Sequence, residues 1–389
     1  MVDCRPGRRN KLAIARLLAR SDLGPEAIDR FLARHEFPMA EGAHRTFVAL
    51  AEDVEGIWLR HRIQGLPEDL AMHAVEGTPL WWVTIEIPGD SRMEYQFETR
   101  RNGEWQRFND PRNPRIARSP VGDSSVCWGP GYAPPDWAFT DPEARVGTLV
   151  EHQIPSRAQR RTNQVTVYLP ARYRPTTRYP LLIVHDGGDY LEFAGMKTVL
   201  DNLIHRLDMA EVIVAFTRPG DRLVEYPNNA AHARWITQEL VPYLNAEYPV
   251  IDEASARCLM GSSFGAIAAF SVAHRNPELF GSLLLQSGSF VFTDIAFDHG
   301  GGPAFDPVVK FVNRYRLRPR PVVDRMFVSC GIYEPLIVQN RSMLEVWRET
   351  GMEVQYVESR DGHNWESWRD RLRDGLSWIF PGDQLFFYE

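Results

Sequence analysis

From residue 181 onward, short apolar runs alternate with helical patterns, and this alternation limits the fold more than any other feature of the chain. The apolar runs occupy residues 181–184, 212–216, 258–260, 282–286, 325–329 and 353–357. Helical periodicity lies between them, notably at 231–247, 266–274 and 340–350. Strands that alternate with helices form a mostly parallel sheet with helices on both faces. The sequence therefore predicts an α/β domain over 145–389, which opens with a strand pair near 147–153 and 164–169.

The run Gly261-Ser262-Ser263-Phe264-Gly265 joins one of these strands to a small-residue helix. Gly-x-Ser-x-Gly in that context is typical of a nucleophile elbow, where the glycines permit a sharp strand-to-helix turn that exposes the serine hydroxyl. Ser263 lies midway between the two glycines, whereas Ser262 does not. The pattern predicts Ser263 as a nucleophile; a plain strand-to-helix turn is the alternative, because Gly- and Ser-rich turns are common.

An acid and a histidine follow the later strands in the order that an α/β-hydrolase requires. Glu334 comes after the strand at 325–329, and His363 comes after the strand at 353–357. We expect His363 to accept the Ser263 proton and Glu334 to orient the imidazole. Asp361 is an alternative acid from the same loop as the histidine. A loop histidine packed against a nearby tryptophan is the alternative interpretation of His363.

The oxyanion of an acyl-transfer intermediate needs two backbone N–H donors. We predict Phe264, at the helix start, and Gly188, in the loop after the strand at 181–184. Gly187-Gly188 is not a phosphate loop, because no Gly-Lys-Ser/Thr ending follows. His185 and Asp186 are expected to anchor this loop. The candidate substrate-binding residues are Asp189, Tyr190, Arg222 and Trp365.

The front of the chain has a different pattern. Residues 1–40 are predicted as a helical segment. Residues 41–120 contain period-two apolar runs bounded by Gly, Pro and Asp, which predict a small β-sandwich. Turn-forming residues then predict a linker at 121–144. Asp298 and His299 precede three glycines in an expected flexible lid, where metal binding is the lesser interpretation.

Composition excludes several classes of function. With 389 residues, two domains are expected, and a formal net charge of −7 gives no basic field for a nucleic acid. The four cysteines lie far apart and form no Cys-x-x-Cys pair, so neither a zinc site nor a disulfide framework is indicated. No run approaches the roughly 20 apolar residues of a membrane span. We therefore expect a cytoplasmic protein without a metal or other cofactor.

Several blocks together resemble a known family. They are Gly261–Phe290, Glu334-Pro335, Gln339-Asn340-Arg341, Gly362–Arg369, His185–Tyr190, Arg222–Tyr226 and Glu239–Pro242. These blocks resemble enterochelin esterases and the wider esterase D group of α/β-hydrolases. The front part resembles the amino-terminal, immunoglobulin-like early-set domain of the same enzymes. The resemblance implies metal-free hydrolysis of catecholate siderophore esters by Ser263, His363 and an acid at the position of Glu334.

The leading hypothesis is a serine carboxylic ester hydrolase that acts through an acyl-enzyme on a small-molecule ester, such as an enterochelin-like trilactone. A feruloyl or other small-ester esterase, or an acyltransferase, is the alternative within the same chemistry. A carbohydrate-binding or regulatory protein with an inactive hydrolase scaffold is the alternative from another class, suggested by the tryptophans of the front domain.

Overall fold

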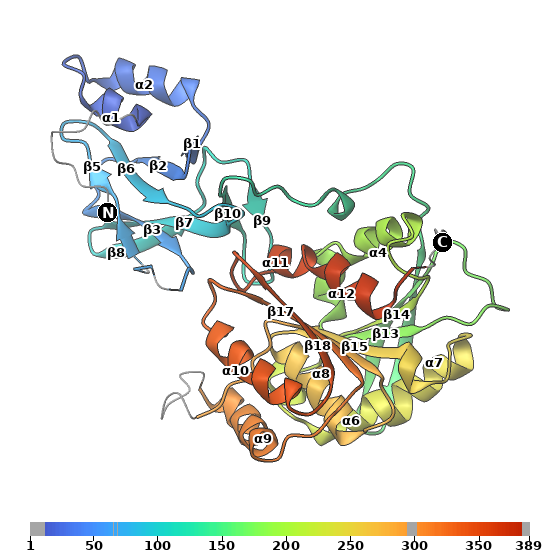
Figure 1. Ribbon diagram of the computed structural model, residues 1–389. Coiled ribbons are helices and arrows are strands. Elements are labelled where there is room, and N and C mark those ends of the chain that lie inside the picture. The colour runs from blue at the N-terminus through green and yellow to red at the C-terminus, as the bar shows by residue number, and fades with distance from the viewer. Residues whose placement is uncertain (1–11, 65, 68, 294–301, 383–389) are drawn as a thin grey trace. The chain divides into compact units, whose positions relative to one another are not determined.

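The computed structural model describes residues 12–64, 66–67, 69–293 and 302–382, and its contacts divide the chain into two units (Figure 1). Unit 1 comprises Met1–Ala133 together with two short segments from later in the chain, Ile332–Glu334 and Arg360–Gly362. Unit 2 comprises the remaining residues from Pro134 onward. Asp298 and His299, the expected lid residues, lie outside the described residues, as does Cys4.

Unit 1 combines a short helical segment with two β-sheets. The helices are α1 (Ala13–Leu18) and α2 (Pro25–Arg34). One sheet has the strand order β1-β2-β6-β5, and the other has the order β4-β3-β7-β10-β9, with β8 paired to β7. The strands are β1 (Met39–Glu41), β2 (His44–Leu50), β3 (Gly56–His61), β4 (Asp69–Ala71), β5 (His73–Ala74), β6 (Leu80–Glu86), β7 (Arg92–Arg101), β8 (Glu104–Phe108), β9 (Ile116–Ala117) and β10 (Ser124–Trp128).

Strand β2 lies between two apolar cores, which explains why its residues 45–49 are all buried. Neighbouring side chains of a strand point to opposite faces. Phe47 accordingly packs with Leu59 and Phe97 between the two sheets. Val48 packs with Ile14 and Phe31 of the helices on the other face. Unit 1 therefore has three layers, with the sheet that contains β2 between the helical segment and the other sheet.

Strand β10 lies inside residues 121–144, the stretch for which the turn formers predict a linker. It pairs with β7 on one side and with β9 on the other, and Val126 and Cys127 are buried. The turn-forming residues before and after it mark the ends of this strand. This part of the expected linker is thus an integral strand of unit 1.

Unit 2 is built on a sheet of eight strands in the order β11-β12-β14-β13-β15-β16-β17-β18. β11 and β12 run antiparallel to each other, β12 runs antiparallel to β14, and all the later pairs are parallel. This is the mostly parallel sheet that the alternating pattern predicts. The strands are β11 (Thr148–Ser156), β12 (Arg161–Leu169), β13 (Leu181–Val184), β14 (Ile213–Thr217), β15 (Arg257–Ser262), β16 (Ser282–Gln286), β17 (Arg325–Gly331) and β18 (Glu353–Ser359).

Helices cover both faces of this sheet (Figure 1). Within β13, Leu181 and Ile183 pack into one core and Leu182 and Val184 into the other, as its alternation requires. The first core includes residues of α6 (Ala230–Arg234), η2 (Trp235–Leu240), α7 (Val241–Glu247), α8 (Phe264–Arg275), α9 (Asp306–Leu317) and α10 (Ile337–Arg348). The second includes residues of α3 (Gly187–Glu192), α4 (Met196–His205), α11 (Trp365–Arg369) and α12 (Leu372–Ile379). The remaining short helices are η1 (Asp136–Ala138), α5 (Arg222–Glu225), η3 (Ala254–Ala256) and η4 (Pro303–Phe305).

The helix predicted at 231–247 contains a π-helical turn, η2, between α6 and α7. Pro242, the second residue after this turn, has no N–H, and its ring crowds the carbonyl one turn earlier. A wider turn at that point relieves the crowding. Glu239 of this turn accepts hydrogen bonds from Ser156 Oγ (2.5 Å) and from the N–H of Arg157 (3.0 Å), which holds the end of β11.

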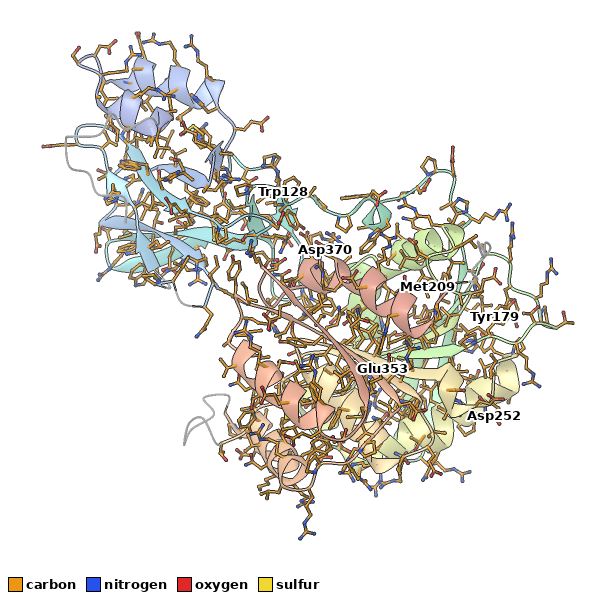
Figure 2. The ribbon with its side chains drawn as sticks, in the orientation of Figure 1. Trp128, Tyr179, Met209, Asp252, Glu353 and Asp370 are labelled. Atoms are coloured by element: carbon orange, nitrogen blue, oxygen red, sulfur yellow. The ribbon has the colours of Figure 1, made fainter. Side chains whose placement is uncertain are left out.

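Because most strands of this sheet are parallel, their amino ends lie together on one side and their carboxyl ends on the opposite side. The amino ends of β17 and β18 are marked by Arg325 and by Glu353, which is labelled in Figure 2, and the two side chains form an ion pair at 3.1 Å. The loops with Ser263, Glu334 and His363 begin at the carboxyl ends of the strands. Within the described part of the chain, no helix is both long and apolar enough to span a membrane.

Candidate active site

Ser263 forms the turn between β15, which ends at Ser262, and α8, which begins at Phe264. Its backbone has φ 55° and ψ −121°, a conformation that L-residues rarely adopt and that costs on the order of 1–3 kcal/mol. The N–H of Ser263 donates to the carbonyl of Gln286 (2.9 Å) at the end of the neighbouring strand. Strain of this kind persists where the surroundings fix it, and here it gives a sharp strand-to-helix turn at Ser263.

The two glycines of the motif are required by close backbone approaches. A Cβ atom on Gly261 would lie 2.4 Å from the backbone of Gly265, where the strand and the helix cross. A Cβ atom on Gly265 would lie 3.0 Å from Oδ2 of Asp186 and 3.3 Å from Cβ of His185. The spacing Gly-x-Ser-x-Gly therefore follows from the packing of α8 against β15 and the loop after β13.

Two helix starts leave backbone donors beside the serine. In α8, the N–H of Ala266 bonds to the carbonyl of Ser263, so the N–H of Phe264 is not used by the helix. In α3, the N–H groups of Asp189 and Tyr190 bond to the carbonyl of Asp186, which leaves the N–H of Gly188 unused by its helix. Both helix starts also carry a partial positive charge.

These donors come from neighbouring strands. β13 and β15 pair in parallel from Leu181 with Arg257 to Val184 with Met260, so α3 and α8 start from adjacent carboxyl ends. The contact that a Gly265 side chain would make with Asp186 confirms the closeness of the two loops. The structure thus brings the loops of Gly188 and Phe264 together.

Glu334 and His363 follow β17 and β18, which pair in parallel up to Gly331 and Ser359. Glu334 is fully buried, and His363 is partly buried. The His363 ring lies edge-to-face on Trp368, with centroids 5.0 Å apart. The tryptophan contact expected from the alternative interpretation is therefore present, and it holds the imidazole by its ring without excluding a proton-transfer role.

Asp361, the alternative acid, has a different set of contacts. Its carboxylate lies 3.3 Å from the guanidinium of Arg92, which is fully buried, and it accepts the N–H of Gly362 (2.7 Å). The segment around it is fixed within unit 1, where the N–H of Arg92 donates to the carbonyl of Arg360 (3.0 Å). The carboxylate of Asp361 is thus engaged by Arg92 and by the N–H of Gly362, and these contacts hold its loop.

The segment that carries Glu334 is fixed within unit 1 as well. The hydroxyl of Tyr333 hydrogen-bonds to that of Ser91 (2.7 Å). The carbonyl of Tyr333 accepts the N–H of Gln64 (2.8 Å). Polar contacts with unit 1 therefore hold the residue next to the candidate acid.

A buried ion pair supports the loop after β13. Asp186, 2% exposed, receives hydrogen bonds from Nε (3.0 Å) and Nη2 (2.8 Å) of Arg222. Burial works against the charged form of Arg222, but the Asp186 carboxylate outweighs it, so the pKa of Arg222 is raised. Asp186 has φ 53°, and its N–H donates to the hydroxyl of Tyr226 (3.0 Å). The guanidinium of Arg222 also lies over the Phe264 ring, at 5.7 Å from its centroid.

A chain of neutral histidines lies beneath the same loop. Nδ1 of His185 lies 3.0 Å from the carbonyl of Met260, which can only accept, so this nitrogen carries the proton. Nε2 of His185 then accepts from Nε2 of His232 (3.0 Å), and Nδ1 of His232 faces the amide of Gln159 (3.5 Å). Burial lowers the pKa of His185 to about 4 and that of His232 well below its usual value. Both histidines are therefore structural anchors, as expected for His185.

The expected substrate-binding residues differ in access. Asp189 is partly buried, and burial, followed by the charge of Asp186, raises its pKa. Tyr190 is fully buried, with its hydroxyl donating to Gln286 Oε1 (2.7 Å), and Trp365 is 9% exposed and edge-on to Tyr190. Tyr190 and Trp365 therefore support the site from below, while Asp189 and Arg222 retain exposed surface.

The sequence analysis missed Ser289. Its hydroxyl lies 3.2 Å from the Ser263 hydroxyl, and its N–H donates to the Ser263 carbonyl (3.2 Å). Ser289 follows β16, the strand beside β15, and this position at the same sheet edge was the available signal. Among the described residues, no group of three or more His, Cys, Asp or Glu side chains could hold a metal ion.

Residues 156–379, more than half of the chain, match the model of the family described as putative esterase. The iron(III) enterobactin esterase of Escherichia coli O6:H1 (strain CFT073) is 23% identical over 330 residues, covering 79% of this chain and 80% of that protein. The uncharacterised protein YjcH of Bacillus subtilis (strain 168) is 29% identical over 148 residues, or 36% of this chain. The match spans 62% of the length of YjcH.

Solved structures show the same fold. The enterobactin esterase FES from Shigella flexneri superimposes with a TM-score of 0.71 at 21% identity, covering 86% of this chain and 92% of the other. A ferulic acid esterase superimposes with a TM-score of 0.53 at 21% identity, covering 60% of this chain and 98% of the other. Unit 2 accordingly has the α/β-hydrolase fold.

Proposed function

The chain belongs to the putative esterase family and is a carboxylic ester hydrolase, and from this premise we propose that it acts through an acyl-enzyme on Ser263. His363 accepts the proton of the Ser263 hydroxyl as the oxygen attacks the ester carbonyl. Glu334 orients the imidazole and stabilises the imidazolium that forms. His363 then protonates the departing alcohol, and water attacks the acyl group by the same route in reverse.

The backbone N–H groups of Phe264 and Gly188 stabilise the oxyanion of each tetrahedral intermediate. Preorganised donors of this kind contribute about 3–4 kcal/mol each to transition-state stabilisation. The observation that carries the proposal is the elbow itself: Ser263 has a strained backbone between two glycines that the packing requires, and it lies beside two helix starts with unused N–H groups.

For the substrate we propose an ester with acidic groups, with catecholate siderophore trilactones as the first candidate. Two arginines near the oxyanion loop support an anionic substrate. Arg222 lies against Phe264, and Arg218 is exposed, with its guanidinium at the position that a Gly188 side chain would occupy. The enterobactin esterases among the relatives support the same substrate class. Feruloyl esters are the second candidate, supported by the ferulic acid esterase fold.

Two further parts of the proposal concern the rest of the chain. The two-sheet unit 1 is proposed to be an early-set, immunoglobulin-like domain that precedes the catalytic domain, on the basis of its strand pairing and its sequence resemblance. The cysteines of the described residues, Cys127, Cys258 and Cys330, are buried thiols that are not joined in disulfides, which supports a cytoplasmic location.

The test compares Ser263→Ala with Ser262→Ala in the full chain, using p-nitrophenyl butyrate. We expect Ser263→Ala to lower kcat by about 10³-fold or more. Ser262→Ala is the matched control: Ser262 is the neighbouring serine, and its hydroxyl is buried. This variant should retain activity. Full turnover by Ser263→Ala would contradict the mechanism.

A fluorophosphonate probe gives an independent readout, since it should label the wild type and not Ser263→Ala. Absence of labelling together with saturable glycan binding would favour the carbohydrate-binding alternative. Iron-free and iron-loaded catecholate trilactones, feruloyl esters and alkyl esters, compared by kcat/KM, decide the substrate class. Added alcohol acceptors separate hydrolysis from acyl transfer.

A further inference from the structure

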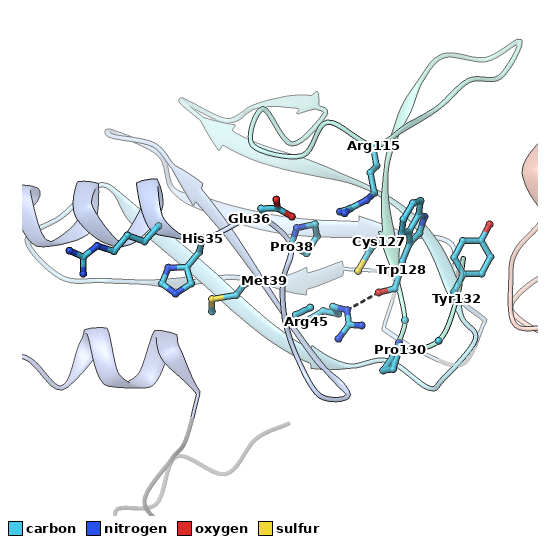
Figure 3. A pocket seen from close by; sticks show the side chains of 14 residues that line it. His35, Glu36, Pro38, Met39, Arg45, Arg115, Cys127, Trp128, Pro130 and Tyr132 are labelled. Atoms are coloured by element: carbon cyan, nitrogen blue, oxygen red, sulfur yellow. Dashed lines mark hydrogen bonds between the residues drawn. The ribbon is translucent and has the colours of Figure 1, made fainter. Parts of the chain in front are cut away.

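Unit 1 contains a pocket of about 510 Å³ that no step of ester hydrolysis uses (Figure 3). It lies between the end of α2, strand β1 and the end of β10, and all of its lining residues belong to unit 1. Its volume is within the range of about 300–1,000 Å³ that is usual for small-molecule sites. Its lining combines arginines with aromatic rings.

Arg45 is the buried cation of this pocket, with 6% of its surface exposed. Its Nε donates to the carbonyl of Trp128 (2.7 Å), as Figure 3 shows, and its Nη1 donates to the carbonyls of Gly42 (2.8 Å) and His44 (2.9 Å). These three acceptors are neutral carbonyl groups. In the described part of the chain, Arg45 forms no ion pair with a carboxylate, and its Nη2 donates no hydrogen bond. A buried guanidinium without a counter-charge is costly, so an anion in the pocket would stabilise it.

Arg115 adds a second positive charge. Its guanidinium lies over the Trp128 ring, 4.5 Å from the centroid, and over the described residues it has no carboxylate partner. Trp128 and Tyr132 lie 5.7 Å apart by ring centroids, and both line the pocket. The lining thus offers two guanidinium groups next to aromatic surface.

The buried thiol of Cys127 also lines the pocket, near enough to Arg45 and Arg115 for both charges to act on it. The carboxylate of Asp110 acts on this thiol as well. Burial raises the pKa of the thiol to about 12, but the charges of Arg45 and Arg115 both act in the opposite direction. The exposed carboxylate of Glu36 lines the pocket as well and is offset by the exposed Arg34. The charges of Arg45 and Arg115 therefore leave the pocket positive.

We propose that this pocket binds a small aromatic carboxylate, with the carboxylate on Arg45 and Arg115 and the ring against Trp128 and Tyr132. Planar guanidinium groups match a carboxylate through paired N–H donors. The aromatic side chains favour a planar ligand over a bare inorganic anion. None of the residues proposed for catalysis lines this pocket, and the proposal does not depend on the nucleophilic role of Ser263.

Isothermal titration calorimetry on the full chain tests the proposal with three probes. Benzoate carries both the ring and the charge, benzamide keeps the ring without the charge, and inorganic phosphate keeps a charge without the ring. We expect benzoate to bind with a Kd of about 0.1–1 mM and at least about tenfold more tightly than benzamide or phosphate.

Arg115→Ala identifies the site, because this side chain is partly exposed and its loss should leave the fold intact. We expect it to weaken benzoate binding about tenfold, with Arg115→Lys intermediate because it keeps the charge but loses the planar group. Arg100→Ala is the matched control: Arg100 also lies over a tryptophan ring of unit 1, Trp105, at 5.4 Å from its centroid, and it does not line the pocket.

Both Arg115→Ala and Arg100→Ala should hydrolyse p-nitrophenyl butyrate at the wild-type rate, which separates this site from catalysis. Equal binding of benzoate and benzamide, equal binding of benzoate and phosphate, or unchanged benzoate binding by Arg115→Ala would each overturn the proposal. Failure of Ser263→Ala to lose activity would overturn the catalytic proposal and leave this one intact.

Discussion

Replacing Arg222 with methionine tests whether the ion pair with Asp186 holds the loop that carries Gly188. The substitution keeps an unbranched apolar side chain but removes both hydrogen bonds to a carboxylate that is 2% exposed. Loss of one partner of a buried pair costs about 3–5 kcal/mol, because the other charge stays buried. The Arg222 side chain is 34% exposed, so water can reach the vacated site, and we expect the lower end, about 3 kcal/mol.

A double-mutant cycle separates the pair from its parts. Asp186→Asn alone should cost about 1–2 kcal/mol, since Arg222 remains solvated on one side. The combination of Arg222→Met with Asp186→Asn should cost less than the sum of the two, with a coupling energy of about 2 kcal/mol. The measurement is urea unfolding at pH 7, followed by tryptophan fluorescence and far-UV circular dichroism.

Arg341→Met provides the matched control. Arg341 forms the same forked arrangement with Glu358, at 2.6 and 2.7 Å, but the two side chains are 54% and 30% exposed. An exposed pair contributes only about 0–1 kcal/mol. Arg222→Met should also lower kcat/KM, because the ion pair fixes Asp186, the N-cap residue whose carbonyl accepts the first N–H groups of the helix that carries Gly188. Equal unfolding costs for the two variants, or an unchanged kcat/KM in Arg222→Met, would refute the reasoning.

Two further predictions follow from the same region. The pKa of His185 falls from 6.5 to about 4 on folding, so its contribution to the free energy of unfolding is present above pH 6.5 and is lost as the pH falls toward 4. Urea unfolding between pH 7 and pH 4.5 should therefore show that the free energy of unfolding decreases by up to about 3 kcal/mol. The variant His185→Asn should show a weaker dependence on pH. A slope identical to that of the wild type would contradict the prediction. Gly261→Ala should cost about 3 kcal/mol or more and abolish activity, since its Cβ would overlap the Gly265 backbone at 2.4 Å, whereas Gly24→Ala, with nothing within 4 Å, should be nearly neutral by thermal unfolding and ester hydrolysis. Comparable losses in both alanine variants would argue against the crossing of strand and helix as the cause.

The sheet of unit 2 and the order of its site loops could be predicted because both follow from local patterns. The apolar runs predicted the parallel strands. Ser263, Glu334 and His363 each follow one of these strands, which predicted that all three lie at the carboxyl ends of the sheet. The three helices for which the sequence analysis gave ranges were predicted within a few residues, although the π-helical turn before Pro242 was not. Its cause is a steric effect within a single turn, which periodicity over a longer window does not detect.

Other features depended on tertiary contacts that a linear pattern does not contain. Strand β10 was assigned to a linker because its flanks are rich in turn formers, and only its pairing with β7 makes it a strand. Tyr190 was expected at the substrate, but the fold turns its hydroxyl to Gln286. Ser289 reaches Ser263 because β16 lies beside β15, and neither residue is close to the other in sequence.

Unit 1 is formed by chain segments that are far apart in the sequence, and this affects how it folds during translation. Arg92 is fully buried in unit 1, yet its partner Asp361 belongs to a segment near the other end of the chain. Ribosomes add about 5–20 residues per second, so the first 133 residues wait on the order of ten seconds or more for that partner. During this interval the guanidinium of Arg92 can pair with Glu94 of its own strand, at 3.0 Å, but not with Asp361. Unit 1 is therefore completed only after the strands of unit 2 up to β18 and the segment Arg360–Gly362 have been translated.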